Sequence, residues 1–304
     1  MADATKVKDI YPISTFIHDL SVTLAATAPP DAGTEAGAEA GATNPIPARR
    51  LIIVGDVHGS RKSLEALLEE VGFDRALGDL VIFAGDLVSK GADSGGVIDL
   101  AGTIGALGVR GNHDDAVLRA AADRRRETGQ AEEEEGVSAS VSVSTRTAET
   151  LSGSQLGFLA SLPLMVRVAV TPSPASLASL PRGVRRVVVV HAGLVPGVAL
   201  EEQCAHAVMH MRSLGREEGG GRFVPLEEPG ERGWMAEWDE WQEGIAEGDR
   251  TMVVFGHDAK RGLQRGRYAL GLDTSCVYGG RLSAWVVGAG GARVVQVDCV
   301  DERD

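Results

Sequence analysis

The sequence predicts an α/β fold in which two mixed β-sheets pack as a central sandwich and α-helices flank it on the outside. The first half of the chain alternates short apolar runs with segments of helical periodicity, as right-handed strand–helix–strand units do. The second half is richer in strand-like runs. With 304 residues, of which 43% are hydrophobic, the chain has enough apolar material for a large core.

Three strands, each followed by a helix, are expected in the first half. Residues 51–54 are wholly apolar and rich in β-branched side chains, which is typical of a strand buried on both faces. Leu64, Leu67, Leu68 and Val71 then recur at helical spacing. The alternation continues with strands at 80–83 and 106–109 and helices at 94–106 and 115–127.

Six strands and two helices are expected in the second half. The strand-like runs are at 164–170, 187–190, 251–255, 267–272, 281–287 and 293–298. The helices are expected at 199–213 and 233–243. Trp234, Trp238 and Trp241 in the second helix form an apolar stripe, which is more often part of a core than a platform for substrate.

One folded domain is expected over residues 49–304, after an extension and disordered linker at 1–48. The linker is rich in Ala, Gly, Pro and Glu and cannot bury enough apolar surface to order itself, so folded structure is expected to start near Arg50. Within the domain, the Glu-rich and Ser/Val/Thr-rich segment 129–147 is expected to be a disordered insertion. The Gly/Glu-rich segment 215–232 is expected to be a loop.

The charge balance is acidic, with 43 Asp and Glu against 30 Lys and Arg, which gives a formal net charge of −13. General binding to nucleic acid is therefore not expected, because the chain repels phosphate backbones at long range. A local site that holds two divalent cations would still attract a phosphorylated small molecule or polyphosphate.

A soluble cytoplasmic protein is expected, and a monomer is favoured. No stretch approaches the roughly 20 apolar residues that span a bilayer, and the N-terminal segment lacks the pattern of a secretory signal. Cys204, Cys276 and Cys299 are odd in number and widely spaced, which argues against a disulfide framework and fits a reducing compartment.

The residues that carry chemistry lie in five short turns, each directly after an apolar strand. The turns are Gly55-Asp56-Val57-His58-Gly59, Gly85-Asp86, Gly111-Asn112-His113-Asp114, His191, and Gly256-His257. In α/β sheets, ligands bind beyond the carboxyl ends of strands, so the five turns are expected to converge on one crevice.

The side chains in these turns are those that two adjacent divalent ions need. Carboxylates and imidazoles suit manganese, iron, cobalt and zinc, and one carboxylate can bridge two ions roughly 3.5–4 Å apart. Asp56 and His58 are two residues apart, so both can face one ion from an extended segment. A lone Gly-Asp is usually just a turn, and His191 alone would more often be a core histidine. The five turns together predict a metal centre.

These motifs together resemble the calcineurin-like metallophosphoesterases, within the phosphoprotein-phosphatase-like group, over about residues 51–299. The resemblance implies a hydrolase in which a hydroxide activated by two metal ions attacks phosphorus. It implies that Asp56 and His58 hold the first metal, that Asp86 bridges both, and that His113 protonates the leaving oxygen. The implied ligands of the second metal are Asn112, His191 and His257.

One segment departs from the protein Ser/Thr phosphatases of this group. They carry Asp and Arg where this chain has Ser89 and Lys90. That pair, with the segments 256–264 and 271–282, resembles the ApaH-like phosphatases, the relatives of symmetrical diadenosine tetraphosphatase. Ser89 can hydrogen-bond His113 but cannot hold it as an imidazolium, and Lys90 cannot grip two oxygens as a guanidinium can. A leaving group that needs little protonation, such as a phosphate, tolerates both changes.

Phosphoanhydrides are therefore the expected substrates: polyphosphate, a dinucleoside polyphosphate or a capped RNA end. The alternative is a protein Ser/Thr phosphatase. An inactive scaffold is disfavoured because all six ligands and His113 are present. Some fungal relatives with this signature are vacuolar, which makes the vacuole the alternative compartment.

Five side chains are candidates for contact with substrate at the rim of the crevice. They are Lys90, Arg110, Arg212, Arg261 and Tyr278. Arg110 at a strand end can equally form a salt bridge, and Arg212 can equally be solvated. Cys204, His206 and His210 have the spacing of zinc ligands without a fourth ligand nearby, so a surface helix is favoured there.

Overall fold

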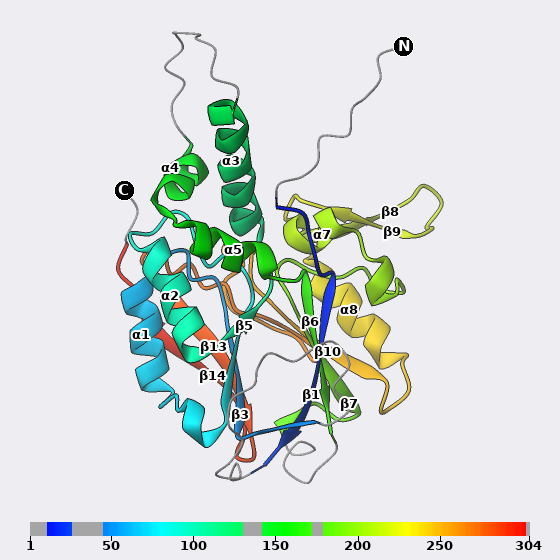
Figure 1. Ribbon diagram of the computed structural model, residues 1–304. Helices are drawn as coiled ribbons and strands as arrows, with labels where there is room; N and C mark the ends of the chain where they lie inside the picture. The colour runs from blue at the N-terminus through cyan, green and yellow to red at the C-terminus, as the bar shows by residue number, and fades with distance from the viewer. Residues whose placement is uncertain (1–10, 26–44, 130–141, 172–178, 302–304) are drawn as a thin grey trace.

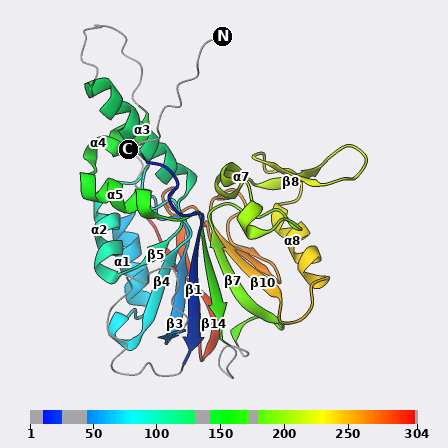
Figure 2. The same cartoon turned by 45° about the vertical axis from the view of Figure 1, so that its right-hand side comes forward.

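The computed structural model describes residues 11–25, 45–129, 142–171 and 179–301, without the side chains of 126–129. Most of the predicted linker and of the predicted insertion lies outside these residues. Two β-sheets stand face to face in the centre of the molecule, and helices cover both outer faces (Figures 1 and 2). The predicted α/β sandwich with two mixed sheets is confirmed.

The first sheet has five strands in the order β14-β13-β3-β4-β5. Strands β3, β4 and β5 are parallel, and β13 is antiparallel to β3 and β14. The strands span Arg50–Val54 (β3), Asp79–Phe83 (β4), Leu107–Gly108 (β5), Arg281–Gly288 (β13) and Gly291–Asp298 (β14).

The second sheet has seven strands in the order β11-β12-β10-β7-β6-β1-β2. Strand β10 is parallel to β7 and β12, and β6 is antiparallel to β7. The strands span Ile17–Leu24 (β1), Ile46–Ala48 (β2), Met165–Val170 (β6), Val184–Val190 (β7), Arg250–Phe255 (β10), Gln264–Arg265 (β11) and Ala269–Gly271 (β12).

The helices form the outer layers. On the side of the five-stranded sheet lie α1 (Arg61–Glu70), α2 (Ser94–Ile104), α3 (Asn112–Gly129), α4 (Val143–Thr150) and α5 (Gly153–Ser161), with the short 3₁₀ helix η1 (Arg75–Leu77). On the other side lie η2 (Leu200–Glu202), α7 (Ala205–His210), α8 (Trp234–Glu243) and a hairpin of β8 (Ser213–Arg216) and β9 (Phe223–Leu226). In the described part of the chain, no helix is long and apolar enough to cross a membrane.

The core has two parts, and β3 contributes to both. Leu51 and Ile53 pack between the two sheets, whereas Ile52 and Val54 pack against the helices of the outer layer. All four side chains are fully buried. A strand that alternates between two apolar environments must be apolar at every position, which is why 51–54 reads as an uninterrupted run.

The expectation that folded structure starts near Arg50 is wrong. Strand β1 lies inside the seven-stranded sheet, parallel to both β6 and β2. Its side chains alternate, and Leu20, Val22 and Leu24 are buried in the core between the sheets. The low-complexity linker separates β1 from the rest of the domain in sequence, but not in space.

Three further expectations need correction. The segment 215–232 is not a simple loop, because it contains β9 and the end of β8. Residues 143–147 of the predicted insertion belong to α4, which begins after the N-cap Ser142. The helix predicted over 199–213 is shorter than expected, since α7 ends at His210 and the chain continues as strand β8.

The cysteine count and spacing argue against a disulfide framework, but one disulfide is present, between Cys276 and Cys299. The hairpin of β13 and β14 pairs Arg281 with Asp298. This pairing brings the segments at the open end of the hairpin together, including two cysteines 23 residues apart in sequence. Spacing along the chain alone did not reveal this contact.

Candidate metal centre

The five predicted turns converge at the carboxyl ends of the strands. The registers align the ends of β3, β4 and β5, pairing Val54 with Phe83 and Phe83 with Gly108. Strands β7 and β10 end on the opposite side of the same crevice, where Gly256 donates its N–H to the carbonyl of His191. The six predicted ligands therefore gather at one point, although they come from both sheets.

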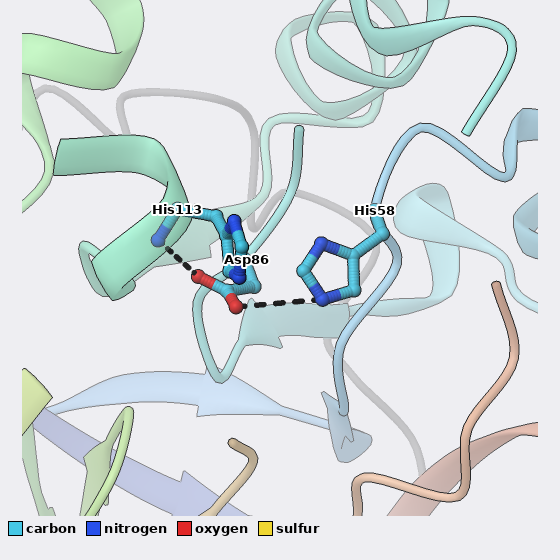
Figure 3. Close-up of side chains that lie close together, drawn as sticks. All are labelled: His58, Asp86 and His113. Atoms are coloured by element: carbon cyan, nitrogen blue, oxygen red, sulfur yellow. Dashed lines mark hydrogen bonds and ion pairs between the residues drawn. The ribbon is translucent and has the colours of Figure 1, made fainter. Parts of the chain in front are cut away.

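Asp86 lies between His58 and His113 (Figure 3). Its Oδ2 atom is 3.4 Å from Nε2 of His58, and its Oδ1 atom is 3.5 Å from Nε2 of His191. The backbone N–H of His113 donates to Oδ1 at 2.9 Å. The two carboxylate oxygens thus face two different groups of donors, which is the arrangement a bridging carboxylate requires.

The remaining donors complete the two groups. Asn112 Oδ1 lies 2.9 Å from Nε2 of His191 and 3.1 Å from Nδ1 of His257. On the other side, Oδ2 of Asp56 is 3.9 Å from Nε2 of His58. Donors that each lie about 2.0–2.2 Å from one ion lie roughly 3–3.5 Å from one another. The donor set therefore fits two divalent cations in both chemistry and spacing.

Each of the three histidines is held by its second ring nitrogen. The contacts join His58 Nδ1 to the carbonyl of Val88 (3.2 Å), His191 Nδ1 to that of Ala84 (2.9 Å), and His257 Nε2 to that of His210 (3.0 Å). A ring nitrogen that faces a carbonyl must carry the proton, so the other nitrogen presents its lone pair to the cluster. This is the usual arrangement of metal-ligating histidines.

The backbone at the site is unusual. Three of the six ligands have positive φ angles: His58 (48°), Asp86 (49°) and His257 (68°), and the neighbouring Ser89 and Lys90 share this conformation. Non-glycine residues adopt it rarely, at a cost of order 1–3 kcal/mol each, and such residues cluster at functional sites. The surrounding fold therefore imposes the directions in which these ligands point.

Two glycines leave room for the carboxylates. A Cβ atom at Gly111 would overlap Oδ1 of Asp86, and one at Gly256 would overlap Oδ1 of Asp56. The N–H of His257 also donates to both carboxylate oxygens of Asp56, at 3.1 and 3.2 Å. The glycine in each motif is thus required because a ligand lies against its backbone.

Two buried aspartates belong to the site but were not among the predicted site residues. Asp114 accepts hydrogen bonds from the N–H groups of Leu87, Val88 and Gly111, and so ties the Asp86 turn to the start of α3. Asp273 lines the cavity beside Asp56. Asp114 lies within one of the predicted turns, and Asp273 lies in the segment 271–282. The contacts of both side chains depend on tertiary structure.

The electrostatics indicate a site that is suited to cations. Burial, together with the charges of Asp273 and Asp86, raises the pKa of Asp56 well above its ordinary value. Burial and the charge of Asp86 raise the pKa of Asp114 to about 7, and burial raises that of Asp273 to about 6. Crowded buried carboxylates of this kind repel one another, and bound cations would offset the repulsion.

The pKa values of the histidine ligands are lowered, whereas those of Asp56, Asp114 and Asp273 are raised. Burial lowers the pKa of His58 to about 3 and that of His257 to about 2, which keeps both rings neutral. Burial alone would raise the pKa of Asp86, but the neighbouring groups His191, His58, His113 and Lys90 together outweigh it and the pKa lies below its ordinary value. Neutral imidazoles and an ionised bridging carboxylate are the forms that bind metal.

His113 differs from the histidine ligands. Its ring packs edge-on against His58, with centroids 5.0 Å apart, and burial lowers its pKa. Among the residues that the structure describes, no side chain hydrogen-bonds this ring. The buried hydroxyl of Ser89 has no hydrogen-bond partner in the part of the chain that is described, so Ser89 does not make the bond to His113 that the sequence allows.

A cavity of about 620 Å³ opens over the ligands and contains three of the five predicted rim residues. These are Lys90, Arg212 and Tyr278, and a further cation, Lys260, lines it too. The ammonium of Lys90 is 3.1 Å from Nε2 of His58 and 5.6 Å from the centre of the Tyr278 ring. Lys90 must release His58 for that nitrogen to bind a metal, which its flexible stem allows.

Arg110 and Arg261 do not line this cavity, and the structure engages both side chains in other contacts. Arg110 is fully buried and binds the carboxylate of Asp115 (3.3 Å) and the carbonyl of Ala160 (2.7 Å). Arg110 precedes helix α3, which begins at Asn112. The side chain of Arg110 therefore does not have to point in the same direction as that of Asn112. Arg261 binds Asp258 at 2.5 Å and a nearby carbonyl at Gly230.

The surface-helix interpretation of the Cys204–His210 segment fits the structure better than a zinc site. His206 binds Glu227 at 2.8 Å and stacks on His210. Within the described part of the chain, the clusters of His, Cys, Asp and Glu with metal-binding spacing are centred on Asp86.

Comparisons with known proteins agree with this geometry. The sequence profile of the family described as calcineurin-like phosphoesterase matches residues 49–288. A curated relative from Acidovorax sp. (strain JS42), bis(5′-nucleosyl)-tetraphosphatase, symmetrical, is 26% identical over 77% of this chain and 90% of its own length. A solved structure provisionally assigned as a diadenosine tetraphosphatase is 32% identical, covers 93% of this chain and 99% of that chain, and has a TM-score of 0.63.

A shorter match points to a different activity. Serine/threonine-protein phosphatase 1 of Salmonella typhimurium (strain LT2) is 39% identical over 74 residues. The match covers 24% of this chain and only 34% of the Salmonella protein, about a third of its length.

Proposed function

The chain belongs to the calcineurin-like phosphoesterase family, and from this premise we propose that it hydrolyses phosphoanhydride bonds, with a dinucleoside tetraphosphate as its substrate. It is a metal-dependent phosphoesterase. The resemblance drawn from its motifs, to that family and to the ApaH-like tetraphosphatases, is confirmed by the family match and the two long relatives. The substrate and the identity of the metals belong to the proposal.

The roles of the side chains follow from their positions. Two divalent ions, when bound by the six ligands, supply Lewis-acid activation of water and of the phosphoryl group. Lys90, Arg212 and Lys260 line the same cavity and would bind the phosphate oxygens and offset the charge that develops on them. His113 lies at the edge of the cavity, where it can give a proton to the leaving oxygen.

The observation that favours an anhydride is the missing partner of His113. No carboxylate in the described residues hydrogen-bonds its ring, so nothing there holds it as an imidazolium. A serine or threonine alkoxide is a poor leaving group and needs a proton from a strong, well-held acid. A nucleoside diphosphate needs little protonation, so this site is better suited to an anhydride. The two long relatives support the dinucleoside tetraphosphate in particular.

A protein Ser/Thr phosphatase is the second candidate, and the Salmonella relative favours it. The match is confined to about a quarter of the chain. A match of this length does not by itself discriminate between the two substrate classes.

The test is a substrate panel with protein loaded with manganese, cobalt or zinc. We expect diadenosine tetraphosphate to be cleaved to two molecules of ADP, with kcat/KM at least 100-fold above that for a phosphoserine peptide. Long-chain polyphosphate and capped RNA are run in parallel. Rapid release of phosphate from the peptide, with no cleavage of any anhydride, would contradict the proposal and favour the protein phosphatase.

A further inference from the structure

A second cavity, of about 350 Å³, adjoins the metal centre on the side of α4. It shares two lining residues, Lys90 and Tyr278, with the cavity over the ligands. The shared residues form the boundary between the two spaces. Its remaining lining comes from the segment 91–94 and from α4: Gly91, Ala92, Ser94, Val143, Arg146, Thr147 and Thr150.

The charged residues of this lining are both cations. They are Lys90 and Arg146, and among the residues that the structure describes no carboxylate lines the cavity. This contrasts with the whole chain, whose formal charge is −13. A cavity with two cations and no anion, in an acidic protein, is an unusual local concentration of positive charge.

Arg146 is available to bind a ligand. The side chain is exposed, and the described residues provide it with no ion pair or hydrogen bond. Glu149, the carboxylate nearest to it on the same helix, is paired instead with Arg124 at 3.6 Å. The hydroxyl of Thr147, by contrast, is used within α4, where it donates to the carbonyl of Val143.

Lys90 connects the two cavities. Its ammonium lies 3.1 Å from Nε2 of His58 at the metal centre and 5.6 Å from the centre of the Tyr278 ring on the boundary. A phosphate chain that started at the metals and passed Lys90 would enter the second cavity, which Arg146 lines. A simple phosphate ester has no further phosphates to place there.

We propose that the second cavity binds the phosphates of the substrate that lie beyond the bond being cleaved, and that Arg146 selects for phosphoanhydrides with a long chain. The inference rests on the proposed function and deepens it, because it assigns a residue that distinguishes a tetraphosphate from a simple phosphate ester. Charge-assisted hydrogen bonds from a guanidinium to phosphate oxygens would supply the binding energy.

The test compares the KM for diadenosine tetraphosphate with the KM for p-nitrophenyl phosphate in Arg146→Ala. The ratio of the two KM values is expected to rise about tenfold, the effect of losing one charge-assisted contact. Arg146→Glu should raise the ratio further and Arg146→Lys should raise it less. Arg182→Ala is the matched control, because Arg182 is an exposed arginine that pairs with Glu247, away from α4; it should leave the ratio unchanged.

Inorganic tripolyphosphate, as a second anhydride, separates the phosphate chain from the nucleoside. A KM increase for both anhydrides supports the assignment to phosphates. An increase for the dinucleotide alone overturns it, because the cavity would then recognise the nucleoside. An unchanged ratio in Arg146→Ala and Arg146→Glu, with anhydrides still cleaved by the wild type, overturns this inference and leaves the proposed function standing. If the wild type cleaves p-nitrophenyl phosphate but neither anhydride, the proposed function fails, and this inference fails with it.

Discussion

At the scale of single residues, the metal centre depends on how few conformations its ligands can adopt. Each histidine ligand is tethered to a backbone carbonyl through the ring nitrogen that does not face the cluster. Three ligands have a left-handed backbone that the fold must impose. The donors are therefore in place before any ion binds, which lowers the entropic cost of binding one.

The contribution of His113 to kcat is predicted to increase as the leaving group becomes poorer. His113→Asn should lower kcat about 100-fold or more toward phenyl phosphate, since a phenolate benefits from protonation. Toward diadenosine tetraphosphate the loss should stay below about tenfold. The measurement is kcat with both substrates, and His206→Asn, which changes an exposed histidine, is the control. An equal loss with both substrates would show that His113 does not act as the acid.

Gly111 is predicted to be essential for metal affinity. In Gly111→Ala the new methyl group would overlap both Oδ1 and the backbone nitrogen of Asp86 and displace the bridging residue. We expect metal affinity to fall about 10-fold to 100-fold, measured by titration calorimetry with manganese. Gly157→Ala is the control, because its Cβ in α5 meets nothing and a helical alanine should stabilise by about 1 kcal/mol. Unchanged metal affinity in Gly111→Ala would contradict the bridging role of Asp86.

At this scale the sequence identified side chains that the structure brings together, but not their surroundings. The donors follow apolar strands in short motifs, so local sequence identifies them. Arg110 and Arg261 lie outside the cavity lining, because closeness in sequence to a ligand does not determine where a long side chain points. Lys260 and Asp273 were missed because only the tertiary fold brings their segments over the metals.

At the scale of elements, strands β3 and β4 are held in register by a buried carboxylate. Asp79 begins β4 and is paired with Arg49 and Arg50, each with a nitrogen 2.5 Å from Oδ2. Burial alone would raise the pKa of Asp79, but the two guanidinium groups outweigh it and the pKa lies below its ordinary value. These two ion pairs fix the start of β4, and Asp86 follows the other end of that strand.

Asp79→Asn is predicted to lower the free energy of unfolding by about 2–3 kcal/mol at pH 7, because it leaves two guanidinium groups without their carboxylate. The folded pKa is depressed, so this stabilisation is fully present above pH 4 and is lost as the pH falls through the folded pKa. The difference between wild type and variant, measured by urea unfolding, should therefore shrink below pH 4. A difference that stays constant from pH 7 to pH 3 would exclude the ion pair as its cause.

A surface pair provides the control for this experiment. Asp298 binds Arg281 at 2.9 Å, but both side chains are largely exposed. Asp298→Asn is therefore expected to change the free energy of unfolding by less than about 1 kcal/mol.

The strands whose ends carry ligands were predictable, whereas several other elements were not. Strand β1 shows the reason most clearly. Its sequence alternates, with Leu20, Val22 and Leu24 buried, so a period-2 signal was present. The segment precedes a low-complexity linker, however, and its partner β6 lies about 150 residues further along the chain. Pairing over that distance leaves no local trace in sequence.

At the scale of the whole molecule, the two sheets can form one site only because they pack face to face through a shared core. Strand β1 is part of that core, so the N-terminal segment is predicted to be required for folding. A chain that begins at Pro45 would lose three buried side chains, each worth roughly 1.5–3 kcal/mol, which is comparable to the whole stability of a domain. We expect this chain to be insoluble or to melt at a much lower temperature.

Point variants keep that prediction testable if the short chain cannot be purified. Leu24→Ala should lower the free energy of unfolding by about 2–5 kcal/mol, because Leu24 is almost completely buried between the sheets. Ile13→Ala should cost less than about 1 kcal/mol, because Ile13 is exposed. Equal effects would mean that β1 contributes little to the core.

The most direct test of the central claim, that six side chains hold two divalent ions across Asp86, is the metal content of the purified protein. The chain is stripped with a chelator, reloaded with manganese or zinc, dialysed and analysed by mass spectrometry. The wild type is predicted to retain two ions per chain, and Asp86→Asn to retain fewer than one. Asp249→Asn, an exposed aspartate, should retain two. Two ions still bound in Asp86→Asn, or one or none in the wild type, would contradict the account.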